Sequence, residues 1–249
     1  MLTNTTVEKL RDMNLKVMAE KFKEQLVNPD INDLSFEDRL GLIVDAEFAN
    51  RRTNRLMRLI KASGYAYANA CLEDVEYHND RNLDKAMIVR LGTCNYVHEH
   101  HNIIILGATG SGKTYLSNAF GIAANRDFLT VKYIRLPELL TELAMARAEG
   151  NYRKILKQYR HVSLLILDEW LLYPLKDPEV RDLLEIAEAR YKKGSTIFCS
   201  QFEVAGWHQK LGDTTMADAI CDRIVHDSYT IIIGGVESMR KRKGIKEKR

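Results

Sequence analysis

The chain has 249 residues, of which 45% are hydrophobic and 29% are charged. A chain of this size and composition can bury one substantial core and a small accessory domain, so we expect a soluble globular protein. It has no run of about 18 apolar residues, and its first residues lack the apolar core of a secretory signal. These features argue against a membrane-spanning helix and predict a cytoplasmic protein. The four cysteines lie far apart, which argues against a disulfide framework or a zinc ribbon.

The net charge of +3 is unevenly distributed along the chain. The tail from Met239 to Arg249 contains seven basic residues and one acidic residue, so residues 1–238 have a net charge of −3. Such a basic tail is either a solvated end or a segment that contacts nucleic-acid phosphates. The sequence leaves both possibilities open.

The first part of the chain has the apolar spacing of helices. Apolar residues at helical spacing predict one helix from Val7 to Leu26. A second helix is predicted to begin after Ser35, because Ser35 and Asp38 match a capping box, and to end at Gly64. We therefore predict a small all-helical amino-terminal domain over residues 1–64.

The middle and end of the chain have a different pattern. Residues 65–77 are predicted to be a linker, and a short helix is predicted over Leu83 to Leu91. Beyond Asn102, strand-sized apolar runs alternate with helical patterns. These runs are NIIIL, LTVKYI, VSLLILD, STIFCS and YTIII. This alternation predicts a parallel sheet with crossover helices, and so a three-layer α/β domain over residues 78–238.

A phosphate-binding loop follows the first predicted strand. The stretch GATGSGKT matches G-x-x-x-x-G-K-[ST] and stands between a strand and a helix, as the mechanism requires. Backbone N–H groups of such a loop converge on phosphate oxygens, and the dipole of the following helix points at the same place. Lys113 is expected to reach the β- and γ-phosphates of ATP, and Thr114 to bind Mg²⁺. The nucleotide-binding residues predicted here are Gly107, Ala108, Thr109, Gly110, Ser111, Gly112, Lys113, Thr114 and Tyr115.

An acidic pair ends the buried strand LLILDE. Asp168 is predicted to hold Mg²⁺ through water, and Glu169 to polarise a water molecule for attack on the γ-phosphate. A protein that only binds a nucleotide does not need the second acid. The pair therefore favours ATP hydrolysis over simple binding.

Polar residues also follow the strand TIFCS. Ser200 and Gln201 are candidates for orienting the attacking water or sensing the γ-phosphate, although polar residues at a strand end are common. Arg223 follows Asp222 on a predicted helix, and the two could form an ion pair. Alternatively, Arg223 could reach the γ-phosphate bound by a neighbouring subunit.

A group of cations lies on one predicted helix near residue 55. Arg51, Arg55 and Arg58 share a helical face, with Arg52 and Lys61 nearby. The stretch from Arg51 to Lys61 contains no acid, although Glu47 could pair with Arg51. We predict that these five cations contact the phosphates of double-stranded DNA without reading its sequence, the alternative being a solvated helix face.

Taken together, these segments resemble the IstB family, whose members are ATP-binding helpers of transposition related to the DnaC helicase loaders of the AAA+ superfamily. The resemblance covers nearly the whole chain. It rests on the helical stretch LSFEDRLGLIVDAEFANRRTNRLMRLIKAS and, in the family's order, on NIIILGATGSGKTYLSNAFG, LLILDE, TIFCSQF, ADAICDRIVH and GGVESMRKRK. It implies a P-loop AAA+ ATPase fold.

The resemblance also implies roles for individual residues. Ser200 and Gln201 would occupy the sensor-1 region, Arg223 would be the arginine finger, and Arg240 would be the family's late S-x-R arginine in the nucleotide site. The chain departs from the family where Gln201 replaces the usual Asn, Tyr115 replaces a common His, and DEW replaces the frequent DEL-G pattern. None of these departures affects the phosphate or metal positions.

The expected function is ATP-dependent binding to target DNA and recruitment of a transposase. Assembly into a homo-oligomer is expected, because an arginine finger acts on the nucleotide of a neighbouring subunit. A helicase loader is the first alternative, since its ATPase domain would look almost the same. A small-molecule phosphotransferase is a second, but no arginine-rich lid is evident between Asp168 and Arg223.

Overall fold

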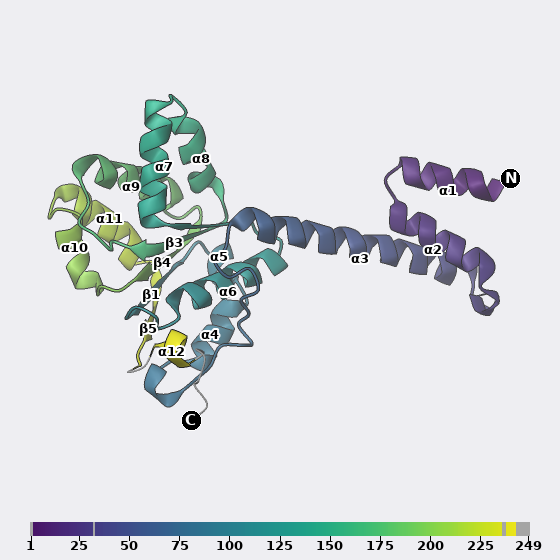
Figure 1. Cartoon of the computed structure of the whole chain (residues 1–249), viewed down its shortest axis with the longest axis horizontal. Helices are drawn as coiled ribbons and strands as arrows, with labels where there is room; N and C mark the ends of the chain where they lie inside the picture. Colours follow the sequence, from purple (N-terminus) through teal and green to yellow (C-terminus); the bar gives the residue numbers. More distant parts are fainter. Residues whose placement is uncertain (1, 32, 236–237, 243–249) are drawn as a thin grey trace. The chain divides into compact units, whose positions relative to one another are not determined.

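The computed structural model of the protein describes residues 2–31, 33–235 and 238–242. The chain forms two compact units, Met1–Arg58 and Leu59–Arg249 (Figure 1). The predicted linker over residues 65–77 thus belongs to the larger unit. In the described part of the chain, no helix combines the length and the apolar character needed to cross a membrane.

The smaller unit begins with two helices, α1 (Leu2–Asp12) and α2 (Lys16–Val27). The prediction of one helix from Val7 to Leu26 is therefore wrong. Asn14 adopts a left-handed backbone conformation with φ of 58°, which ends α1. The N–H of Leu15 then donates to the carbonyl of Leu10 at 2.8 Å, as in a helix that ends with a left-handed residue. Apolar spacing continues through both helices, so it did not indicate the break.

The third helix, α3 (Phe36–Ser63), begins and ends as predicted. The Ser35 hydroxyl accepts a hydrogen bond from the N–H of Asp38 at 3.1 Å, which confirms the cap. Gly64 follows the helix with φ of 74°, a conformation that favours glycine. Within the smaller unit, the buried Glu47 carboxylate accepts the N–H groups of Val17 and Met18 at 3.0 and 3.2 Å, and so caps the start of α2.

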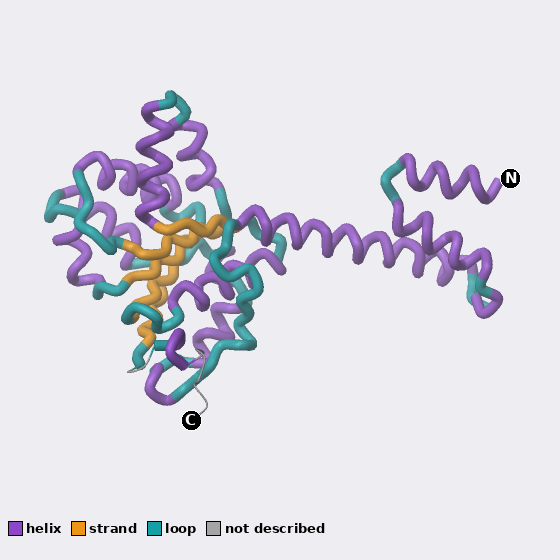
Figure 2. The backbone as a smooth tube through the Cα atoms, viewed as in Figure 1, coloured by secondary structure: helices purple, strands orange, loops and turns teal. Residues whose placement is uncertain are grey.

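The larger unit is built on a five-stranded sheet, drawn in orange in Figure 2. Its strands are all parallel. The order of the strands across the sheet is β2-β3-β4-β1-β5. The strands are β1 (Asn102–Gly107), β2 (Val131–Arg135), β3 (Leu164–Trp170), β4 (Ser195–Ser200) and β5 (Ser228–Ile233). All five correspond to predicted strands, which confirms the parallel sheet.

Helices cover both faces of the sheet, which gives the predicted three layers. Alternate residues of β1 point to opposite faces, so that Ile104 packs in one apolar cluster and Ile103 in the other. The Ile104 cluster includes residues of α7 (Leu136–Ala148), α8 (Tyr152–His161), α9 (Asp177–Arg190), α10 (Trp207–Lys210) and α11 (Thr215–Val225). The Ile103 cluster includes residues of α4 (Lys85–Gly92), α5 (Asn95–His98) and α6 (Lys113–Arg126).

At the end of the sheet where its strands begin, the buried Arg190 side chain joins three elements. Its guanidinium donates to the Thr196 hydroxyl at 3.0 Å and to the carbonyls of Tyr159 and Val162 at 2.9 and 2.8 Å. It also donates to the carbonyl of Ser195. Because each acceptor is an oxygen, every nitrogen of the buried guanidinium has a partner, either at the end of α8, at Val162 before β3 or at the start of β4.

The segment between α3 and α4 is irregular but packs against the larger unit. Ala70 and Val75 are buried, and the N–H of Tyr67 donates to the side chain of Asn118 in α6 at 2.9 Å. A short helical turn, η2 (Asn79–Arg81), precedes α4. This segment lies next to the P-loop and contributes to the pocket described below.

Candidate functional site

The P-loop connects the carboxyl end of β1 to the start of α6. Gly110 and Gly112 have φ values of 78° and 100°, which a residue with a side chain rarely adopts. A Cβ atom at Gly112 would also lie 3.1 Å from the Arg81 guanidinium. The loop therefore requires glycine at both positions, and α6 directs its free N–H groups toward the space that the loop surrounds.

Lys113 is buried at the first position of α6. Its ammonium donates to the carbonyls of Gly107 and Ala108 at 2.7 and 2.9 Å. Burial lowers the pKa of Lys113, while the negative charge of Asp168 nearby acts in the opposite direction. A cation held in this way at a helix amino end can transfer its hydrogen bonds to phosphate oxygens.

Thr114 and Asp168 lie side by side although they are far apart in the sequence. The Thr114 hydroxyl donates to Asp168 Oδ2 at 2.7 Å, and the Tyr133 hydroxyl of β2 donates to the same oxygen at 3.0 Å. Burial raises the pKa of Tyr133, and the neighbouring Asp168 carboxylate raises it further. Tyr133 therefore stays a neutral donor to the carboxylate.

Glu169 follows Asp168 at the end of β3 and has different surroundings. Its φ of 54° is left-handed, and its own N–H donates to Asp168 Oδ1 at 2.9 Å. The Glu169 carboxylate is partly exposed and lies 3.7 Å from the guanidinium of Arg135, which ends β2. This geometry leaves Glu169 accessible to water while Asp168 stays buried.

The two sensor candidates after β4 have different contacts. The buried Ser200 hydroxyl donates to the carbonyl of Trp170 at 3.1 Å and accepts the N–H of Phe202. Gln201 is exposed, and its side-chain oxygen accepts the Thr109 hydroxyl of the P-loop at 2.8 Å. Of the two, Gln201 is therefore the one whose side chain contacts the P-loop.

A pocket of about 260 Å³ extends from the P-loop along the segment before α4. Tyr67, Val75, Leu116 and Met239 give it apolar walls. The remaining lining residues are Asp74, Glu76, Arg81, Gly110, Gly112, Lys113, Thr114 and Tyr115. A pocket that joins a phosphate-binding loop to an apolar space suits a nucleotide.

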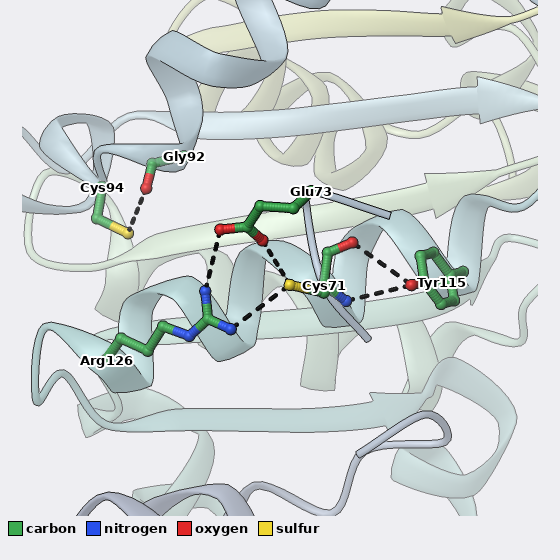
Figure 3. A network of polar contacts seen from close by, with 6 residues as sticks. All are labelled: Cys71, Glu73, Gly92, Cys94, Tyr115 and Arg126. Carbon is green, nitrogen blue, oxygen red and sulfur yellow. Dashed lines mark hydrogen bonds and ion pairs between the residues drawn. The ribbon is translucent and has the colours of Figure 1, made fainter. Parts of the chain in front are cut away.

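Tyr115 anchors the wall of this pocket to α6. Its hydroxyl accepts the N–H of Cys71 at 3.2 Å and donates to the carbonyl of the same residue at 3.4 Å (Figure 3). Beside it, Arg126 contacts the Glu73 carboxylate and the Cys71 thiol at 3.4 and 3.5 Å. These contacts hold the segment that contains Cys71 and Glu73 against α6.

The wall of the pocket was not predicted from the sequence, because residues 65–77 match no motif. The tyrosine content of these residues could have indicated that they pack against the domain. The stretch contains Tyr65, Tyr67 and Tyr77, and aromatic residues at this density are unusual in a solvated linker.

Arg223 lies away from the P-loop of its own chain. It lines a depression together with Asn102 and Thr196, which stand at the amino ends of β1 and β4. Its guanidinium contacts Glu188 of α9 at 3.3 Å and the carbonyl of Ala219 at 2.7 Å. Action of Arg223 on a bound nucleotide would therefore require a second subunit.

The predicted cations of α3 are exposed in the structure. Arg51 pairs with Glu47 at 2.7 Å and donates to the carbonyl of Asn14, and Arg58 donates to the carbonyl of Asn54. The side chain of Arg240 and the whole of residues 243–249 lie outside the described residues, so the expected role of Arg240 and of the tail's end stays a prediction.

The residues at the P-loop fit ATP with Mg²⁺. Ser111 offers a buried hydroxyl that has no hydrogen-bond partner among the described residues. The Thr114 hydroxyl and the Asp168 carboxylate supply adjacent oxygen atoms, the ligand type that Mg²⁺ prefers. Lys113 adds a positive charge on the same side of the loop.

Known proteins match this chain over nearly its whole length. Residues 8–247 match the family described as IstB-like ATP binding protein. A putative insertion sequence ATP-binding protein of Sinorhizobium fredii is 40% identical over 97% of this chain and 98% of its own length. The insertion sequence IS21 putative ATP-binding protein of Pseudomonas aeruginosa is 28% identical over 98% of this chain and 88% of its own length.

Solved structures support the same fold. The crystal structure of the DnaC helicase loader covers 67% of this chain with a TM-score of 0.54 and 21% sequence identity, and 98% of that structure is matched. A replication initiator DnaA bound to AMPPCP and single-stranded DNA covers 69% of this chain with a TM-score of 0.57. The larger unit thus has the P-loop AAA+ fold, and the match over residues 8–247 shows that the chain belongs to the family of IstB-like ATP-binding proteins.

Proposed function

We propose that this protein is an ATPase that assembles on double-stranded DNA and recruits a transposase to it. The observation that carries the hydrolytic part is the position of Glu169. Its carboxylate is partly exposed, and it directly follows the buried Asp168, whose side chain accepts the hydroxyl of Thr114 in the P-loop. This arrangement supports a metal held near Asp168 and a water molecule activated by Glu169.

Transposition is favoured over other uses of ATP by the relatives. Those that match almost the full chain are named insertion sequence ATP-binding proteins. DNA binding is supported by the exposed arginines of α3, because cations along one helix face suit a phosphate backbone. The five residues proposed for this contact are Arg51, Arg52, Arg55, Arg58 and Lys61.

A helicase loader is the second candidate, and the likeness to the DnaC loader favours it only at the level of the fold. The two functions differ in the protein partner. The transposase encoded in the same insertion sequence should bind this protein on DNA in the presence of ATP, whereas a replicative helicase should not.

The proposal is tested by measuring phosphate release from Mg²⁺-ATP with and without duplex DNA, followed by capture of each partner on immobilised duplex. We expect hydrolysis that responds to DNA and capture of the transposase. Capture of the helicase alone would favour a loader, and a protein that hydrolyses no ATP under either condition would contradict the ATPase.

A further inference from the structure

A turn at Asp80–Asn82 lies where three parts of the larger unit meet. The Arg81 side chain from this turn is 5% exposed and lines the pocket next to the P-loop. Arg81 belongs to no motif in the sequence, and the phosphate chemistry derived above does not use it. A buried arginine in a binding pocket calls for an explanation, because burying a cation is costly.

The guanidinium of Arg81 joins the two sides of the pocket. One terminal nitrogen donates to the carbonyl of Glu76 at 2.6 Å, and the other donates to the carbonyl of Ser111 in the P-loop at 2.9 Å. Glu76 and its neighbour Val75 line the far side of the pocket. A planar group with two donors is suited to fix the separation of two carbonyl oxygens.

The side of the pocket that Arg81 holds suits a nucleoside rather than phosphate. Tyr67 and Val75, which belong to the segment before α4, give it apolar surface, which suits a flat base. Asp74 and Glu76 add two acidic residues to the lining, and negative charge next to the pocket disfavours phosphate on this side.

The same turn also holds the segment after β5. The N–H of Gly234 donates to the carbonyl of Arg81 at 2.9 Å, and Arg242 forms an ion pair with Asp80. The N–H of Met239, which lines the pocket, donates to the carbonyl of Gly110 in the P-loop at 2.9 Å. The turn thus supports two walls of the pocket, one formed by the segment before α4 and one by the segment after β5. The phosphate groups of ATP would instead be held by the P-loop itself.

We propose that Arg81 is a positioning residue that joins the nucleoside wall of the pocket to the P-loop. Binding of the nucleoside part of ATP therefore depends on Arg81 more than binding of the triphosphate part does. This inference rests on ATP binding at the proposed site. It assigns to Arg81 no contact with the attacking water or the γ-phosphate.

The test compares the affinity of the full chain for ATP and for inorganic tripolyphosphate, which lacks the nucleoside, by titration calorimetry with Mg²⁺. In Arg81→Met we expect ATP affinity to fall about tenfold or more, the effect of losing hydrogen bonds from a charged group. Tripolyphosphate affinity should change less than about twofold.

Arg81→Lys provides a second variant that keeps the positive charge. A lysine cannot span both carbonyls, so the same selective loss of ATP affinity is expected. Arg153→Met is the matched control, since it removes an exposed cation of the same unit and should leave both affinities unchanged.

Two results would overturn the role of Arg81. One is an equal loss of affinity for ATP and tripolyphosphate, which would limit Arg81 to shaping the P-loop or supplying charge. The other is an unchanged ATP affinity in both variants. A wild-type chain that binds tripolyphosphate but not ATP would instead contradict the proposed nucleotide site, so the two failures can be told apart.

Discussion

Asp168 and Glu169 are neighbours in the chain, but the fold gives their carboxylates different surroundings. Asp168 accepts hydrogen bonds from Thr114 and Tyr133 and is buried, whereas Glu169 is partly exposed beside Arg135. The left-handed backbone at Glu169 contributes to this difference. Two acids in different surroundings can therefore act separately, one near the metal and one on water.

Glu169→Gln is expected to bind ATP with nearly wild-type affinity and to hydrolyse it about a hundredfold more slowly or worse, because only the proton-accepting carboxylate is lost. Lys113→Ala should instead lose tight ATP binding, since we expect its ammonium to contact the phosphates. Titration calorimetry gives the affinities, and phosphate release gives the rates. Wild-type turnover in Glu169→Gln would show that another residue activates the water.

Tyr133→Phe removes a single hydroxyl that orients Asp168. We expect the Mg²⁺ concentration for half-maximal hydrolysis to rise about fivefold, the effect of one hydrogen bond worth about 1 kcal/mol. Tyr159→Phe is the matched control, because the hydroxyl of this buried tyrosine also donates to a carboxylate, that of Glu142, away from the P-loop. An equal change of the Mg²⁺ requirement in both variants would rule out a specific role for Tyr133.

A sequence pattern identifies a site residue only when the residues that act with it are its neighbours along the chain. The P-loop and the acidic pair are recognisable because neighbouring residues perform the chemistry. Tyr133 and Arg81 reach the site from 35 and 30 residues away along the chain, through contacts with Asp168 and Ser111. Tyr133 is one of 11 tyrosines, and no local pattern distinguishes it from the others.

The elements were predictable where burial determines the sequence pattern. Strands covered on both faces are continuous apolar runs, and all five predicted runs are strands. The break between α1 and α2 was missed because it depends on the backbone of Asn14, which the apolar spacing does not report. Asparagine is one of the few residues that tolerate this conformation, so it was the available signal.

The proposed DNA contact belongs to α3. Arg55→Ala combined with Arg58→Ala is expected to weaken duplex binding for unrelated sequences and to leave ATP affinity unchanged. Because each lost phosphate contact lowers the slope of log affinity against log salt by about 0.9, the slope should fall by about 1.8. Fluorescence anisotropy across a salt series measures both quantities.

A control for this variant is available on α8, where Arg153 and Lys157 are exposed one helical turn apart. Arg153→Ala combined with Lys157→Ala removes the same charge from another helix. A loss of the salt slope in the α8 variant, with none in the α3 variant, would move the DNA contact to α8.

At the scale of the whole molecule, the position of Arg223 predicts that activity requires an assembly. Arg223→Ala should bind ATP but hydrolyse it at least about a hundredfold more slowly. In an equal mixture with Lys113→Ala, some neighbouring pairs combine an intact P-loop with an intact arginine. With random assembly, hydrolysis should recover to about a quarter of the wild-type rate. A mixture as inactive as its components would contradict action between subunits.

The amino and carboxyl ends of the strands in the central sheet carry different groups. Arg190 and its oxygen acceptors lie at the amino ends of the strands. The P-loop, Asp168 and Glu169 lie at the carboxyl ends. Buried networks such as that of Arg190 hold elements together, whereas Glu169 has a backbone conformation that favours glycine. A screen for variants that express well and resist heat would therefore retain Arg190 and accept glycine at position 169. Improved folding yield is consequently no evidence that the proposed hydrolysis is intact, and selection has to include a measurement of phosphate release.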